Sequence, residues 1–375
     1  MTPGRLGGAI ALTLAACIAA GLAAATREPV QQVPPGLIQN GRVETRQGGA
    51  IDREVAALAG AEPVWLLWRV PLVAGDRELC STHYSDRGPY ARGYAVDWNP
   101  PGIGSMVVPA VAPPATPVSI EAGTGLVVLV RLVDRGVERV RTLADDCPID
   151  AGGRTLQWLS GVTPAESLRF LEGLVAGMGV GHLPLEARRN IAGAAITAIS
   201  LHRDPAADTA LDRLAVGTDR DARRQAAHAL AGTRGARGFV SLQKMLAAER
   251  DVDERRLLVG ALGLTREPGT VEALRTLTRD PDARIRAEAV YWFVQRGGAG
   301  VIAEATTLID TDADDNVRRR AVSGLARLPA DESIPALLEL ARTGTTPSVR
   351  KEAVGALSRS KDPRALAFME TLLKR

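Results

Sequence analysis

The chain has few of the residues that most often carry redox or metal chemistry. Among its 375 residues there are only 3 cysteines and 4 histidines, and no two cysteines form a C-x-x-C pair. A thioredoxin-like redox motif and a c-type haem attachment site are therefore excluded. We expect no cofactor.

Aromatic residues are also scarce, at 3% of the chain, and they are unevenly placed. Six of them lie between Trp65 and Trp98. Because large aromatic side chains dominate core packing, this cluster indicates that the first part of the chain has a core of its own. A chain of 375 residues is also longer than one ordinary domain.

A marked excess of either charge is absent. The formal net charge is +3, and residues 151–375 hold 33 basic and 28 acidic residues. A nucleic-acid footprint requires positive charge clustered along one face. We therefore expect no nucleic-acid partner.

Long apolar runs are missing except at the N-terminus. Residues 6–25 are almost wholly small and apolar, follow Arg5, and end in Ala23-Ala24-Ala25, which provides an A-x-A cleavage site. We expect a signal peptide over residues 1–25 and a linker over 26–36. The protein would then be exported, periplasmic or associated with the envelope, with no membrane span in the mature chain.

Two alternatives to soluble release remain open for this leader. Leu14-Ala15-Ala16-Cys17 resembles the lipobox of a bacterial lipoprotein, which would make Cys17 a lipidation site and an anchor. The apolar run continues past Cys17, where a mature lipoprotein usually turns polar, so release after Ala25 is favoured. An uncleaved anchor is the third interpretation, because about 20 apolar residues can just span a bilayer.

Beyond the leader, the cysteines are a single pair, Cys80 and Cys147. In an oxidising compartment, an even pair favours a disulfide over two free thiols. The sequence therefore predicts a bond that closes a long loop in the first part of the chain.

Residues 37–150 are predicted to form a small, mostly β domain. A β-rich run over 64–72 is expected to form a hairpin with residues 77–80, and a second hairpin to join 126–133 to 137–143. Prolines between residues 100 and 117 disfavour a central strand there. A short helix is expected over Ile51 to Ala59.

The best candidate for chemistry in this domain is the segment Cys80 to Asp86, together with Asp97 and Trp98. Its His83, with nearby hydroxyls and carboxylates, could act as a base for a nucleophile. A structural histidine beside a disulfide is the favoured interpretation, because the spacing matches no catalytic motif. Some nearby aromatics could stack on a sugar or peptide, although filling the core is favoured: Tyr84, Tyr90, Tyr94 and Trp98.

From residue 185 onward a nine-residue sequence motif recurs six times, from ARRNIAGAA at 187–195 to VRKEAVGAL at 349–357. Its second residue is always arginine: Arg188, Arg223, Arg255, Arg286, Arg318 and Arg350. A regular period of 31 to 35 residues indicates stacked units and not one globular core.

Each unit is predicted to be a pair of helices. Four residues before the arginine stands a helix-capping residue in five of the copies, and apolar residues follow at helical spacing. Such pairs bury their apolar faces only by stacking. We expect an all-α solenoid over residues 185–375, preceded by a helical join and N-terminal cap over 151–184 in which Thr163 to Glu166 begins a helix.

The repeats resemble the HEAT family, in particular its short variety named after phycobiliprotein lyases, with the signature D-x-x-V-R-x-x-A-x-x-A-L. Asp282 to Arg286 and Asp314 to Arg318 match the opening of that signature closely. The resemblance covers about residues 185–375, and together with the leader it indicates an exported bacterial member of this family. It implies a scaffold or adaptor that binds proteins.

The resemblance also has two enzymatic branches. The iron-dependent hydroxylases carry repeated His-Glu pairs, which are absent here because the four histidines are followed by Tyr, Leu, Arg and Ala. The chromophore lyases act on bilins in photosynthetic cells, and nothing beyond the repeat itself supports that activity, while the export signal disfavours it.

Two features of the repeats bear on function. The arginine ladder of Arg223, Arg255, Arg286, Arg318 and Arg350 could bind anions, but a structural role linking neighbouring units is favoured. The fourth copy carries Tyr291-Trp292 where the other copies mostly have small residues. These aromatics are accommodated by local repacking, or else they are contacts for a partner.

The sequence thus predicts a multidomain chain, with a small β-rich N-terminal domain and a C-terminal α-α superhelix of HEAT repeats. Its expected function is a non-enzymatic scaffold or adaptor of the bacterial cell envelope that binds another protein. The alternative is a ligand-binding or hydrolytic N-terminal domain presented by a structural solenoid.

Overall fold

The computed structural model describes residues 32–48, 50–75, 79–80, 82–85, 88–92, 94–96, 98 and 123–374, with the backbone alone at 82–85 and 88–92. The predicted signal peptide, Cys17 and the proline-rich stretch lie outside these residues. Within them, no helix is both long and apolar enough to cross a bilayer.

A five-stranded sheet forms the centre of the N-terminal part, in the order β2-β10-β3-β7-β8. β10 runs parallel to β2 and β3, and the other neighbours are antiparallel. The strands are β2 (Arg42–Gln47), β3 (Val64–Pro71), β7 (Gly125–Val133), β8 (Gly136–Ala144) and β10 (Thr155–Ser160).

Two small sheets accompany it. β9 pairs in parallel with two other short strands, and β4 pairs with β5 in an antiparallel ribbon. Their bounds are β1 (Ile38–Gln39), β4 (Thr82–Ser85), β5 (Gly88–Arg92), β6 (Tyr94–Ala95) and β9 (Ile149–Asp150).

The late hairpin is confirmed as β7 and β8, and the predicted short helix is α1 (Ile51–Leu58). The early hairpin is wrong. One edge of β3 pairs with β7 over the whole length of β3, and the middle of its other edge pairs with β10. Leu79 and Cys80 lie in no strand, and the Leu79 carbonyl accepts instead from the amide of Ala144 at the end of β8. Residues 77 and 78 lie outside the described residues.

The domain boundary predicted at residue 150 is too early, because β10 lies inside the main sheet between β2 and β3. The β part therefore ends near Ser160. The predicted join over 151–184 consists of this strand followed by helix α2 (Pro164–Val175). The cap of α2 is as predicted, since Thr163 and Glu166 form a reciprocal capping box.

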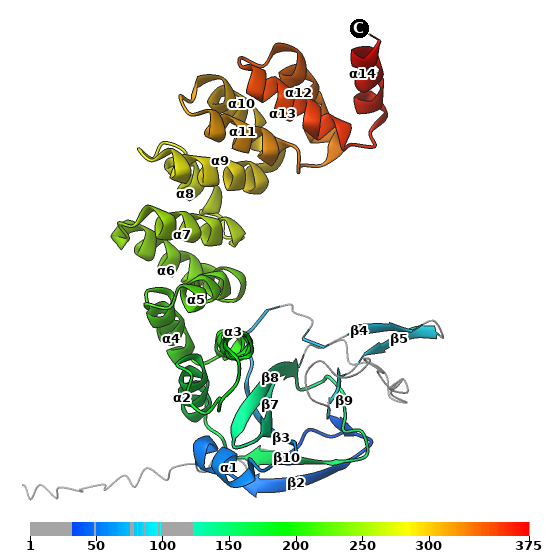
Figure 1. Ribbon diagram of the computed structural model, residues 1–375, viewed down its shortest axis with the longest axis vertical. Coiled ribbons are helices and arrows are strands. Elements are labelled where there is room, and N and C mark those ends of the chain that lie inside the picture. Colours follow the sequence, from blue (N-terminus) through cyan, green and yellow to red (C-terminus); the bar gives the residue numbers. More distant parts are fainter. Residues whose placement is uncertain are drawn as a thin grey trace, which may run out of the picture.

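Residues 185–374 form six consecutive pairs of helices, as the repeat predicts. The pairs rise in a stack from the sheet toward the C-terminus (Figure 1). They are α3 (Leu185–Leu201) with α4 (Ala206–Ala215), α5 (Arg220–Thr233) with α6 (Gly235–Ala248), α7 (Val252–Leu264) with α8 (Thr270–Leu277), α9 (Ala283–Gly297) with α10 (Ile302–Thr311), α11 (Asp315–Leu325) with α12 (Ala330–Thr343), and α13 (Pro347–Ser358) with α14 (Pro363–Leu373).

The two faces of the sheet belong to two different cores. Along β3, Trp65 and Leu67 point to one side, while Leu66 and Trp68 point to the other, following the two-residue period of a strand. The Leu66 side joins a core that continues through every helix pair as far as Ala365. The sheet thus covers the first face of the helical stack, which would otherwise be exposed to water.

The other face of the sheet packs over the predicted disulfide. Cys80 and Cys147 are bonded, with their Cα atoms 5.3 Å apart, and both are buried beside Trp65 and Trp158. The bond joins positions 67 residues apart and ties the segment after β3 to the loop after β8.

We expect a Cys80→Ala/Cys147→Ala variant to lose about 4 kcal/mol of unfolding free energy at most, because the bond restricts a long loop in the unfolded chain. Denaturant titration of both proteins with and without reductant measures this. Reductant should destabilise the natural chain alone. Equal sensitivity of both proteins would contradict a structural role for this bond.

A buried series of hydrogen bonds links the sheet to the helical stack. The ring Nδ1 of His202 lies 2.7 Å from the carbonyl of Ala198, which can only accept, so Nδ1 carries the proton. In the neutral ring Nε2 then accepts from Ser167 Oγ at 2.9 Å, and Ser167 Oγ accepts from Trp68 Nε1 at 2.8 Å. One strand and two helices are joined in this way.

Burial lowers the pKa of His202 from 6.5 to about 4, outweighing the hydrogen bond to Ala198, which raises it. The unfolded chain therefore binds more protons than the folded chain between these values, so stability falls as the pH drops from 6.5 to 4. The full loss is about 3 kcal/mol.

A His202→Gln variant should show a flatter dependence of unfolding free energy on pH across this window, measured by denaturant titration. His182→Gln is the matched control, because His182 is exposed. If His202→Gln kept the full pH dependence of the natural chain, this role for His202 would be refuted.

Candidate binding surface of the helical stack

The first helix of each pair begins at the predicted cap. Asp219, Asp251, Asp282, Asp314 and Thr346 accept hydrogen bonds from backbone amides of the first turn. The first copy lacks this cap, as the sequence indicates, because Pro184 at that position makes no side-chain hydrogen bond. These caps fix where each helix begins, and so where its arginine lies.

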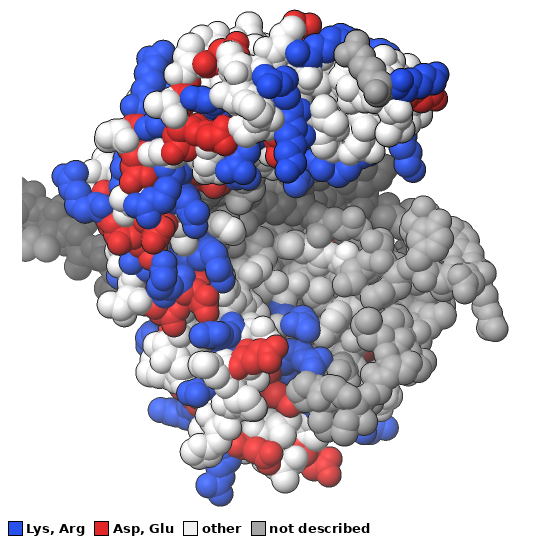
Figure 2. All heavy atoms as spheres, turned by 45° about the horizontal axis from the view of Figure 1, so that its top comes forward, with Lys and Arg blue, Asp and Glu red and all other residues white. Residues whose placement is uncertain are grey.

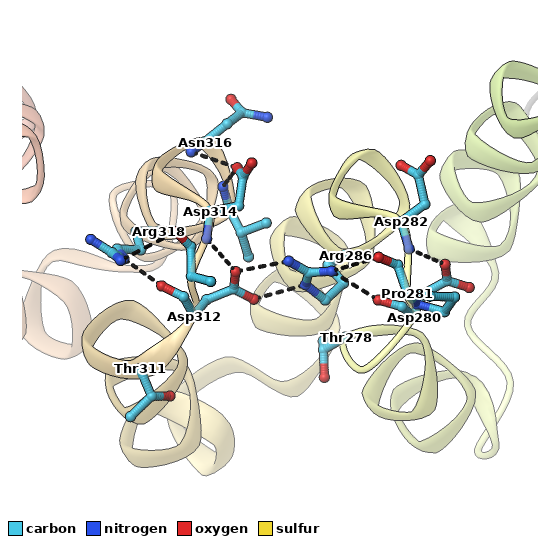
Figure 3. A network of polar contacts seen from close by, with 12 residues as sticks. Thr278, Asp280, Pro281, Asp282, Arg286, Thr311, Asp312, Asp314, Asn316 and Arg318 are labelled. Atoms are coloured by element: carbon cyan, nitrogen blue, oxygen red, sulfur yellow. Dashed lines mark hydrogen bonds and ion pairs between the residues drawn. The ribbon is translucent and has the colours of Figure 1, made fainter.

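Arg286 shows what the arginine ladder does (Figure 3). Its guanidinium donates to the carbonyls of Asp280 and Pro281, at 3.0 and 3.1 Å, in the loop before its own helix. It also donates two bonds to the Asp312 carboxylate, at 2.9 and 3.0 Å, in the loop before the next unit. One side chain therefore fixes two successive loops.

The same link recurs in the preceding units. Arg223 binds Glu249 at 2.9 Å, and Arg255 binds Asp280 at 2.6 Å. The ladder arginines in these units are largely covered, with side chains between 16 and 21% exposed. The structural interpretation of the ladder is supported, because these guanidinium groups are already engaged.

The acidic partners were not predicted, although the sequence carries a signal for them. Each stands two residues before a capping aspartate and accepts the amide of that aspartate: Glu249, Asp280 and Asp312. An acidic-x-Asp pattern one repeat apart therefore marks the accepting loop. Gly344 takes that place in the last unit, so Arg318 has no carboxylate there and donates to a backbone carbonyl of its own loop. Arg350 of the last unit also donates to a carbonyl of its own loop.

Burial of the Asp312 carboxyl would by itself raise its pKa, but bonds from Arg286 and from the Asp314 amide lower it below the ordinary value. The pair is thus ionised at neutral pH. Its contribution to stability is present above the ordinary pKa of an aspartate and is lost as the pH falls through the lowered value.

Replacing Asp312 by alanine should lower the unfolding free energy by about 2 kcal/mol, because the half-buried Arg286 loses a bidentate acceptor. Asp310→Ala is the control, since Asp310 is exposed and only two residues away. Thermal and denaturant unfolding measure both variants. Equal stability of the two would show that the ladder does not hold neighbouring units together.

Tyr291 and Trp292 are both half-buried, and they differ in what they contact. Trp292 fills the space above Gly263 of the preceding unit, where an added Cβ would lie 2.2 Å from the indole Cγ. Its Nε1 donates to Glu288 at 2.8 Å. Local repacking therefore accounts for Trp292.

Tyr291 lies at the edge of a hollow of about 460 Å³ between the α9, α11, α12 and α13 helices. Three arginines line it: Arg320, Arg327 and Arg359. Most of the remaining wall consists of small serine and alanine residues, which leave the space open, together with leucine and isoleucine. The guanidinium of Arg320 stacks over the Tyr291 ring at 4.4 Å.

The structure describes the side chains of only some of the candidate residues that the sequence predicts in the β part. The Trp98 indole donates to the Ala151 carbonyl at 3.0 Å, and Tyr94 packs edge to face with Trp65. Both contacts favour core packing. Asp86, Asp97 and the side chains of His83, Tyr84 and Tyr90 lie outside the described residues.

Ser167 and His202 have the separation of a nucleophile and its base, yet they are 0% exposed. The Ser167 hydroxyl oxygen also accepts from Trp68. A substrate cannot reach this hydroxyl, so the pair is structural. Among the described residues, no group of three or more His, Cys, Asp or Glu side chains could hold a metal ion.

Charges of both signs alternate along the visible face of the stack, with no large area of one sign (Figure 2). The face seen in Figure 2 thus shows no continuous basic stripe of the kind that nucleic-acid binding requires.

Comparison with known proteins agrees with the repeat. Residues 302–375 match the family model of HEAT repeats. Residues 302–375 therefore carry HEAT repeats. Among curated proteins, none matches it.

Solved structures similar to this chain include proteins of several kinds. Human deoxyhypusine hydroxylase is 15% identical, over 55% of this chain and 90% of its own, with a TM-score of 0.30. YibA of Escherichia coli is 15% identical over 56% and 76%, with a TM-score of 0.32. CpcE and CpcF of phycocyanin lyase from Nostoc give 18% identity over 55% and 80%, with a TM-score of 0.31.

Proposed function

We propose that this chain is a non-enzymatic scaffold or adaptor of the bacterial cell envelope, which binds another protein through the surface of its helical stack. The observation that carries the proposal is how the stack uses its polar groups. Its ladder arginines and loop carboxylates bind one another between units, so they stiffen the surface and do not converge on a reacting centre.

Two further features support this role. The sheet closes one end of the stack, which leaves the lateral surface of six helix pairs as the extended face for a partner. HEAT repeats commonly bind proteins, and binding of this kind relies on many modest contacts and a few anchors.

The cellular location is part of the proposal and depends on the sequence. The apolar leader and its A-x-A site favour export, with release after Ala25 or, alternatively, a lipid anchor on Cys17. A buried disulfide suits an oxidising compartment.

The proposal is tested by photo-crosslinking of the full chain in the cell envelope. A photoreactive residue would replace exposed side chains of the stack, Val240 or Leu366, or exposed side chains of the β part, Arg53 or Glu62. Crosslinked products are identified by mass spectrometry.

We expect the same protein to be crosslinked from positions of the stack and not from Arg53 or Glu62. Crosslinks from the β part alone would support the alternative, in which that domain binds the ligand and the stack only presents it. Absence of any crosslinked protein from the stack would contradict the scaffold.

A further inference from the structure

We propose that the hollow beside Tyr291 is the anchor site of the stack, and that it takes acidic side chains of a partner segment that also carries apolar residues. The inference rests on the proposed function, because it names the partner chemistry that the stack would recognise. The hollow carries positive charge, has a partly apolar wall and lies near the C-terminal end of the stack.

The charged residues that line the hollow are all positive. None of its lining residues is acidic, and three are arginines. Arg327 and Arg359 are exposed and make no side-chain hydrogen bond or ion pair within the described part of the chain. They differ in this from Arg223, Arg255 and Arg286, each of which binds a carboxylate.

Arg320 is partly engaged but available. Its Nη2 lies 3.4 Å from Glu288, a long contact, and its side chain is 37% exposed. Its guanidinium lies over the Tyr291 ring, 4.4 Å from the centroid, a cation–π contact that restricts the orientation of the guanidinium beside the hollow. A planar, oriented guanidinium is suited to binding a carboxylate with two hydrogen bonds.

The nearby carboxylates do not neutralise the hollow from within. Glu288 binds Trp292 as well as Arg320, and Glu352 accepts from Ser323 at 3.2 Å. Neither carboxylate lines the cavity. A ligand that brings its own negative charge is therefore favoured.

The wall favours a peptide over a bare anion. Leu328, Ile334 and Leu337 provide apolar surface beside the arginines. A volume of about 460 Å³ lies within the usual range for ligand pockets and exceeds what a single carboxylate or phosphate fills. A segment that alternates acidic and apolar side chains would satisfy both kinds of surface.

The test uses the full chain and a short fluorescein-labelled peptide of alternating Glu and Leu, with a matched peptide in which Gln replaces Glu. Binding is followed by fluorescence anisotropy at low ionic strength. The test variant is Arg327→Ala/Arg359→Ala. The control is Arg256→Ala/Arg279→Ala, which removes the same charge from exposed positions outside the hollow.

We expect the acidic peptide to bind the natural chain and the control equally, and the test variant about tenfold or more weakly, because charge-assisted hydrogen bonds are lost. The Gln peptide should bind weakly to all three. Equal weakening in the two variants, or no binding to the natural chain, would overturn the proposal. Displacement of the peptide by equimolar inorganic phosphate would overturn it in favour of a phosphate site.

The scaffold and the hollow can fail separately. If the crosslinked partner is captured equally by the Arg327→Ala/Arg359→Ala variant, the scaffold stands and the hollow is not its anchor. If the peptide binds at the hollow but no partner is crosslinked from the stack, the proposed function fails while the site remains.

Discussion

The structure depends on each helix pair having its apolar faces covered by its neighbours. No pair can bury these faces alone, so the core runs without interruption from β3 and β7 through all six pairs. The sheet closes the first end of this continuous core. The β part and the solenoid therefore share this core, while the β part has a second core on the other face of its sheet.

The arginine ladder fixes how neighbouring units are positioned within this packing. Apolar contacts alone allow neighbouring units to slide, whereas the two bonds from Arg286 to Asp312 hold successive loops at a defined separation. The ladder links Arg223, Arg255 and Arg286 to carboxylates of the following loops, and it ends where Gly344 replaces the acidic partner. The hollow lined by Arg327 and Arg359 lies in this last part, where the ladder arginines Arg318 and Arg350 donate to carbonyls of their own loops.

Local patterns predicted most of the solenoid. A cap and an apolar face each lie within a few residues, so helix pairs, caps and the late hairpin could be identified from spacing alone. Even the acidic-x-Asp pattern before Asp251, Asp282 and Asp314 was visible in principle.

Contacts between distant residues could not be predicted in the same way. β10 is a six-residue strand whose place between β2 and β3 is set by long-range pairing. The Trp68–Ser167–His202 chain joins residues about 100 positions apart, and the hollow arises only when α9 meets α11, α12 and α13. Long-range pairing thus decided both the domain boundary and the site.

The proposed role requires that a partner binds the helical stack and that the sheet serves as its cap. Hydrogen–deuterium exchange of the full chain, with and without its crosslinked partner, measures this most directly. The account predicts new protection over α9 to α13, with the main sheet unchanged. Protection confined to residues 37–160 would contradict it.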